Sequence, residues 1–144
     1  MHYNMSPQPS ETPLVDHLVQ LTYLIQSILL EAGTEHDLSF VQIRLLGILR
    51  DREPGMQELA HHLNLDKSSV TGLINRAERR GLVERVASST DRRSFSVRLT
   101  DSGLHIVHTV GSEIEQRIDK AAERLTQQER AQLIKIAAKM IHRT

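Results

Sequence analysis

The side chains best suited to specific binding chemistry lie on one face of a predicted helix from Lys67 to Arg80. Apolar residues recur there every three or four positions and are expected to face the core. The other positions carry short hydroxyls, an amide and guanidiniums, which can hydrogen-bond phosphates and the edges of adenine or guanine. The candidate contacts on this face are Lys67, Ser68, Ser69, Thr71, Gly72, Asn75, Arg76 and Arg79.

A second polar cluster lies between two predicted strands, Leu82 to Val86 and Phe95 to Leu99. Two adjacent arginines in this loop suit a narrow and strongly negative DNA minor groove. A solvated surface is the alternative interpretation of the helix face alone, but a basic loop directly after it favours DNA contact. The candidate contacts in the loop are Ser88, Ser89, Asp91, Arg92 and Arg93.

The charge distribution supports a local phosphate-binding surface. The whole chain is neutral, with 18 basic and 18 acidic residues, which taken alone argues against a nucleic-acid partner. Residues 1–65, however, hold three basic and eight acidic side chains, whereas residues 66–98 hold eight basic and four acidic ones. The segment with the two clusters is therefore positive on an otherwise acidic or neutral chain.

Composition excludes several other classes of protein. The chain has no cysteine, so disulfides and thiolate metal sites are ruled out, and a reducing cytoplasm is the expected location. Two Tyr, two Phe and no Trp leave little for the base stacking that single-strand binders use. No apolar run approaches the roughly 20 residues of a membrane span, and the polar N-terminus does not resemble a signal peptide.

Hydrophobic periodicity and capping signals predict six helices and one hairpin. Pro13 opens a long amphipathic helix that ends near Gly33, and Ser39 with Gln42 forms a capping box for the next. Asp66 is a good N-cap for the polar helix, which should stop at Gly81. The expected fold is mainly α with a small β-hairpin wing (α+β), a winged helix-turn-helix core flanked by long dimerisation helices.

These elements predict a division of the chain into three parts. Residues 1–12 are expected to be a disordered tail, and residues 36–100 a winged helix-turn-helix DNA-binding domain. The terminal helices have more apolar face than one small chain can cover, which indicates pairing with a second copy. Residues 13–35 and 101–144 are therefore predicted to form a helical dimerisation region.

Four sequence segments, in order, resemble the MarR family of multiple antibiotic resistance regulators. The run Asp91 to Thr100 fits the wing signature D-x-R-x-x-x-x-x-L-T. Upstream, the segments 57–60, 63–71 and 78–83 are similar to that family as well. The motif agreement covers about Met56 to Gly103, while the flanking helices agree only in length and pattern.

The resemblance implies a homodimeric transcription regulator, most simply a repressor, that binds a palindromic operator in double-stranded DNA. In such families Asp91 would brace Arg93 while an arginine enters the minor groove. Some relatives carry arginine or proline where this chain has Gly72, so base specificity cannot be transferred. Many members release DNA when a small aromatic anion binds between the dimer helices and the winged domain. No cofactor is implied.

Two alternative functions are open, and a third is not expected. Eight histidines allow a metal-responsive, zinc-binding regulator, with His105 and His108 three residues apart and His36 next to Glu35 as candidates. A winged helix can also serve as a protein-interaction module without DNA binding. No nucleophile elbow, phosphate-binding glycine loop or H-E-x-x-H run occurs, so an enzyme is not expected.

Overall fold

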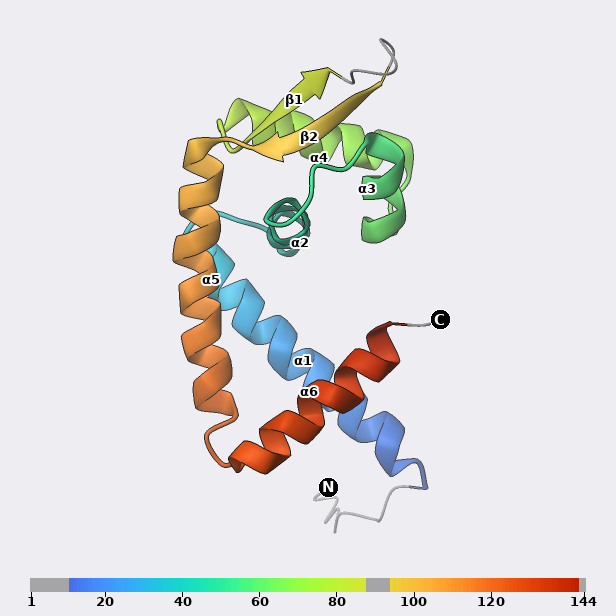
Figure 1. Cartoon of the computed structure of the whole chain (residues 1–144), viewed down its shortest axis with the longest axis vertical. Helices are drawn as coiled ribbons and strands as arrows, with labels where there is room; N and C mark the ends of the chain where they lie inside the picture. Colours follow the sequence, from blue (N-terminus) through green and yellow to red (C-terminus); the bar gives the residue numbers. More distant parts are fainter. Residues whose placement is uncertain (1–10, 88–93, 143–144) are drawn as a thin grey trace, which may run out of the picture.

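The protein is described by a computed structural model that places residues 11–87 and 94–142 (Figure 1). The helices and strands follow the predicted order: α1 Pro13–Thr34, α2 Phe40–Leu49, α3 Met56–Leu63, α4 Lys67–Arg79, β1 Val83–Ala87, β2 Phe95–Leu99, α5 Asp101–Ala121 and α6 Gln127–Ile141. The mainly helical fold with a two-stranded wing is therefore confirmed. Most of the predicted N-terminal tail lies outside the described residues.

The predicted capping signals fix where the helices begin and end. The Ser39 hydroxyl accepts from the Gln42 amide nitrogen at 3.2 Å, while the Gln42 side chain accepts from the Ser39 nitrogen at 2.8 Å. Thr126 and Glu129 form the same reciprocal pair at the start of α6. Gly81 has a φ of +73°, the left-handed conformation that ends α4 at little cost for glycine.

The hairpin is antiparallel, and Val83 pairs with Leu99 while Ala87 pairs with Phe95. The first strand begins one residue later than predicted, because the backbone of Leu82 is used elsewhere. Its nitrogen donates to the Ala77 carbonyl at 3.0 Å, and its carbonyl accepts from the Thr100 nitrogen at 3.1 Å. Leu82 therefore ties the end of α4 to the start of α5.

The core lies in the winged half of the molecule. The largest fully buried side chains come from α2, α3, α4 and the hairpin: Leu45, Leu59, Leu63, Leu73, Ile74, Val70, Val83 and Val97. In Figure 1 the hairpin and α4 lie at one end, α1 and α6 extend toward the opposite end, and α5 runs between the two ends. Helix α6 buries none of its residues.

The outer helices leave large apolar side chains exposed. Leu14 on α1 is 70% exposed, and Ile134 and Ile141 on α6 are 71% and 72% exposed. By length and composition alone α1 could also cross a membrane, although polar residues interrupt its apolar runs, and one such helix is weak evidence of a membrane span. Buried helices of soluble proteins pass the same test.

Candidate nucleic-acid interface

Helix α4 has one buried face and one accessible face. Val70, Leu73, Ile74 and Ala77 are at most 2% exposed and fix the helix to the core. Among the predicted contact residues, the exposed ones are Lys67, Ser68, Ser69, Arg76 and Arg79, and the half-buried ones are Thr71, Gly72 and Asn75. The predicted residues therefore lie on the side of α4 that is turned away from the core. Helix α4 itself runs alongside the hairpin (Figure 1).

The first turn of α4 is organised by Asp66. Its carboxylate accepts from the Ser69 backbone nitrogen at 2.7 Å and from the Ser68 hydroxyl at 2.9 Å. These hydrogen bonds, the Ser69 backbone one foremost, hold the pKa of the Asp66 carboxyl below its ordinary value. The Thr71 hydroxyl donates to the Lys67 carbonyl at 2.9 Å. The hydroxyl protons of Ser68 and Thr71 are thus used within the helix, and the two hydroxyl oxygens can still accept a hydrogen bond from another group.

Arg85 on β1 links the hairpin to α4. Its guanidinium donates to Asn75 Oδ1 at 2.6 Å and to Glu78 Oε1 at 2.8 Å. The guanidinium carbon also lies 5.1 Å from the centre of the Phe95 ring, within range of a cation–π interaction. Arg85 therefore sets the position of the wing strands relative to α4. Sequence reasoning missed this residue, because a strand arginine has no spacing that marks it.

The contact with Arg85 limits what Asn75 can read. An asparagine recognises adenine through two hydrogen bonds, one of which needs its side-chain oxygen free. In this structure that oxygen accepts from Arg85 at 2.6 Å, which uses one of its two lone pairs and holds the amide toward the hairpin. Bidentate reading of adenine by Asn75 requires either the second lone pair of Oδ1 to reach the base while the Arg85 contact holds, or that contact to break.

Gly72 gives Arg76 room on the accessible face. A Cβ atom at Gly72 would lie 3.3 Å from Arg76 Nη1, which is tighter than an ordinary contact. A larger residue at this position would push the guanidinium away from the helix surface. The Arg76 guanidinium therefore lies over the backbone of Gly72 on the accessible face, where it can reach a base edge.

The predicted wing contacts Ser88, Ser89, Asp91, Arg92 and Arg93 lie outside the described residues. The strands that lead into this loop are well defined. Arg98 on β2 donates through Nε to Glu84 Oε1 on β1 at 2.6 Å, directly across the hairpin. Arg98, one of the arginines in the basic segment, is therefore already paired with a carboxylate of the protein itself.

A mostly apolar cavity of about 380 Å³ lies between α2 and α5. Its lining residues are Leu38, Ile43, Leu46, Gly47, Arg50, Val107, Val110, Gly111, Ile114 and Glu115. Arg50 supplies the positive charge at the cavity and donates to the adjacent Asp51 carboxylate, with an Nη2–Oδ2 distance of 2.9 Å. The volume falls within the roughly 300–1,000 Å³ typical of small-molecule sites.

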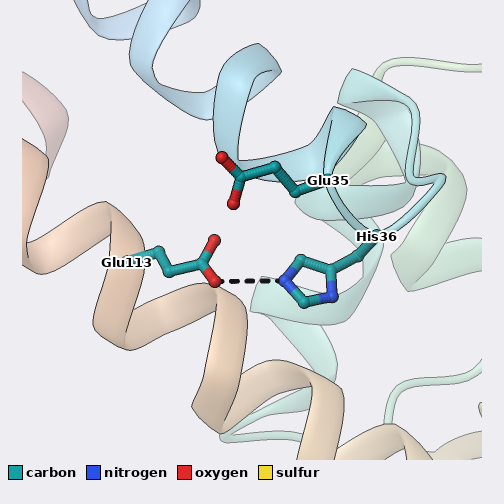
Figure 2. A group of neighbouring side chains, drawn as sticks. All are labelled: Glu35, His36 and Glu113. Atoms are coloured by element: carbon teal, nitrogen blue, oxygen red, sulfur yellow. Dashed lines mark hydrogen bonds and ion pairs between the residues drawn. The ribbon is translucent and has the colours of Figure 1, made fainter.

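Of the predicted metal candidates, His36 lies in a cluster of possible ligands, whereas His105 and His108 lie elsewhere on α5. His36 meets Glu35 and Glu113 at the junction of α1, α2 and α5 (Figure 2). His105 and His108 are exposed on α5, and within residues 11–87 and 94–142 they join no such group. Glu113 was not predicted, since it lies 77 positions from His36 and only the packing of α5 brings the two together.

Comparison with known proteins agrees with this geometry. The MarR family profile matches residues 36–94. The transcriptional regulator FarR of Neisseria gonorrhoeae is 34% identical over 79 residues, which are 55% of this chain and about half, 53%, of FarR. The uncharacterised regulator YwhA of Bacillus subtilis is 28% identical over 131 residues, covering 90% of this chain and 94% of YwhA.

Among solved structures, NadR in complex with 4-hydroxyphenylacetate superposes with a TM-score of 0.76. The superposition covers 96% of this chain and 97% of NadR at 24% identity, so it shows the shared fold. The family match spans α2, α3, α4 and β1, and the YwhA alignment covers 90% of the chain. Residues 36–94 therefore match the helix-turn-helix region of the MarR family, and the relatives that the chain resembles are transcriptional regulators.

Proposed function

We propose that this protein is a homodimeric transcriptional repressor that binds a palindromic operator with α4 in the major groove. The observation that carries this proposal is the split of α4 into a buried face and an accessible face of hydroxyl, amide and guanidinium groups. A rigidly packed recognition helix can approach base edges without rearranging the core. Blocking access of RNA polymerase to the promoter is the simplest consequence of binding.

The exposed apolar surface of α1 and α6 supports dimerisation. Leu14, Ile134 and Ile141 are each at least 70% exposed, although they lie on helices with apolar faces. Burying an apolar side chain of this size stabilises by about 1.5–3 kcal/mol, so a second copy would gain much by covering them. Removal of the chain after Leu125 should then give monomers that bind DNA poorly, and light scattering that still reports dimers would contradict this.

The cavity between α2 and α5 supports regulation by a small aromatic anion. Its walls are apolar enough for a ring, and Arg50 can exchange Asp51 for a ligand carboxylate. NadR, a protein of the same fold, was crystallised with such a compound, 4-hydroxyphenylacetate. We expect 4-hydroxyphenylacetate, as a probe, to weaken operator binding by the intact protein. The Arg50→Ala variant should lose this response and keep its DNA affinity.

A protein-interaction module, an enzyme and a membrane protein are less favoured. None of them accounts for the basic loop that follows the accessible face of α4. The family match also favours a role in the cytoplasm, where the chromosome lies, and no catalytic activity.

Selection of bound sequences from random duplexes tests the proposed function. We expect an inverted repeat whose half-sites are about 34 Å apart, one turn of DNA, because each subunit contributes one α4. The Arg76→Ala variant should relax base choice at one position of each half-site, at a cost of about 1–3 kcal/mol. Failure to enrich any sequence, with the protein folded, would leave the protein-interaction module as the better explanation.

A further inference from the structure

A cluster of side chains at the junction of α1, α2 and α5 combines an imidazole with two carboxylates. Glu35 and His36 follow the last turn of α1, and Glu113 projects from the middle of α5 (Figure 2). One potential ligand atom from each residue lies within 4.8 Å of the others. The three atoms thus converge on one point from two segments that are distant in the sequence.

The distance between two of these atoms already matches metal coordination. His36 Nε2 and Glu113 Oε1 are 3.2 Å apart. A tetrahedral zinc site with bonds of about 2.0–2.1 Å separates neighbouring ligand atoms by roughly 3.3–3.4 Å. The two atoms are therefore already at the separation of two ligands, and the imidazole needs only to turn toward an ion placed between them. The other oxygen of Glu113, Oε2, is buried and has no hydrogen-bond partner, so it is free to serve as a second donor.

The electrostatics of the cluster favour a divalent cation. Arg117 pairs with Glu31 at 2.5 Å and with Glu35 at 2.9 Å, and Glu113 adds a third carboxylate. With a neutral imidazole, three carboxylates and one guanidinium leave a net charge of minus two. The C-terminal end of α1 adds negative potential and has no basic side chain in its last turn. A divalent ion would bring the net charge of these side chains to zero.

We propose that Glu35, His36 and Glu113 bind a divalent transition-metal cation, with Zn²⁺ as the best match. Imidazole nitrogen and carboxylate oxygen are common zinc ligands, whereas Mg²⁺ and Ca²⁺ prefer oxygen alone. Three protein ligands leave one coordination position for water. Glu35, which is exposed, turns from Arg117 toward the ion.

The site is connected to the recognition helix. Arg80, which caps the C-terminus of α4, donates to the carbonyl of His36 at 3.0 Å and to that of Asp37 at 2.8 Å. The backbone that carries a metal ligand is therefore hydrogen-bonded to the end of α4. Zinc that fixes His36 against α5 also fixes the position of α4, which couples metal binding to DNA affinity.

Titration of the full-length protein with ZnCl₂ against a competing chromophoric chelator tests the site. The wild type should bind one Zn²⁺ per chain. The His36→Ala and Glu113→Gln variants should bind more than about ten-fold more weakly, and Glu113→Gln keeps the shape of the side chain. The matched control is His105→Ala, an exposed histidine on α5, which should bind like the wild type. Equal zinc affinity in all four proteins, or no zinc bound by the wild type, overturns the proposal.

A second measurement tests the link to α4 and rests on the proposed function. Zinc should change the affinity of the wild type for its selected duplex, and the Arg80→Ala variant should bind zinc normally and lose that change. Unchanged DNA affinity on zinc binding by the wild type would contradict the link. The chelator titration uses no DNA, so it decides the metal site even if the proposed function fails.

Discussion

Replacing Arg85 by alanine should destabilise the winged half and alter what α4 reads. The substitution removes the hydrogen bond to Asn75, the ion pair with Glu78 and the contact with the Phe95 ring. A hydrogen bond from a charged group contributes about 1.5–3 kcal/mol, and a surface ion pair contributes at most about 1 kcal/mol. The cation–π contact adds about 0.5–1 kcal/mol.

These contributions do not add in full. The side chains of Arg85 and Glu78 are 29% and 39% exposed, so water replaces part of what is lost. Arg85 Nε is also buried without a partner, a cost that the alanine variant escapes. The expected loss for Arg85→Ala is therefore about 2 kcal/mol. The Arg85→Lys variant keeps the positive charge but loses the planar guanidinium, so its stability should lie between those of the wild type and Arg85→Ala.

Urea unfolding at one fixed protein concentration measures the loss, because a dimer's stability depends on concentration. A double-mutant cycle with Asn75→Ala should give a coupling energy of about 1 kcal/mol, the value expected for residues in direct contact. The freed Asn75 should also gain preference for adenine in duplex selection. An Arg85→Ala variant within about 0.5 kcal/mol of the wild type, with unchanged base preference, would refute the reasoning.

Three further predictions follow from particular residues. The Gly103→Ala variant should be less stable than the wild type by about 2–3 kcal/mol in urea unfolding, because the added Cβ would overlap the Leu82 carbonyl. In the control variant Gly111→Ala the added Cβ meets open space, so the protein should gain about 0.5–1 kcal/mol of stability. Equal effects of the two substitutions would contradict this prediction. Because the pKa of Asp66 is lower in the folded protein than in the unfolded chain, its ionised form contributes stability above about pH 4, and this is lost on further acidification. The stability difference between wild type and Asp66→Asn should therefore be constant from pH 5 to 7 and shrink below pH 4, and a difference independent of pH would count against the role of the charge. The Arg92→Ala, Arg93→Ala double variant should weaken binding to all duplexes alike in anisotropy titrations, and unchanged binding would remove the wing from the interface.

Local signals made the helix boundaries predictable. Capping boxes at Ser39 and Thr126, the cap at Asp66 and the glycine at Gly81 each act within one turn of the chain, so they can be read directly from the sequence. The buried face of α4 was predictable for the same reason, because a spacing of three and four residues fixes which side chains share a face.

Features that depend on packing between distant segments were not predictable. The convergence of Glu113 on His36 needs the placement of α5 against the end of α1, and the Arg85 contacts need the hairpin to fold over α4. The predicted role of Asn75 in reading a base is altered by one such contact. Its amide suits adenine by type, but Arg85 on the neighbouring strand donates to its oxygen and fixes its orientation, and only the tertiary structure shows that contact.

The most direct test of the central claim is the salt dependence of binding to a duplex pool, measured by fluorescence anisotropy with the purified full-length protein. Contacts of α4 and the basic loop with phosphates should make the logarithm of the affinity fall linearly with the logarithm of salt concentration. With about 6–10 phosphate contacts per dimer, affinity should drop by roughly 10³- to 10⁵-fold between 50 and 200 mM salt. A folded protein that binds no duplex at 50 mM salt would contradict the proposal that this protein is a DNA-binding regulator.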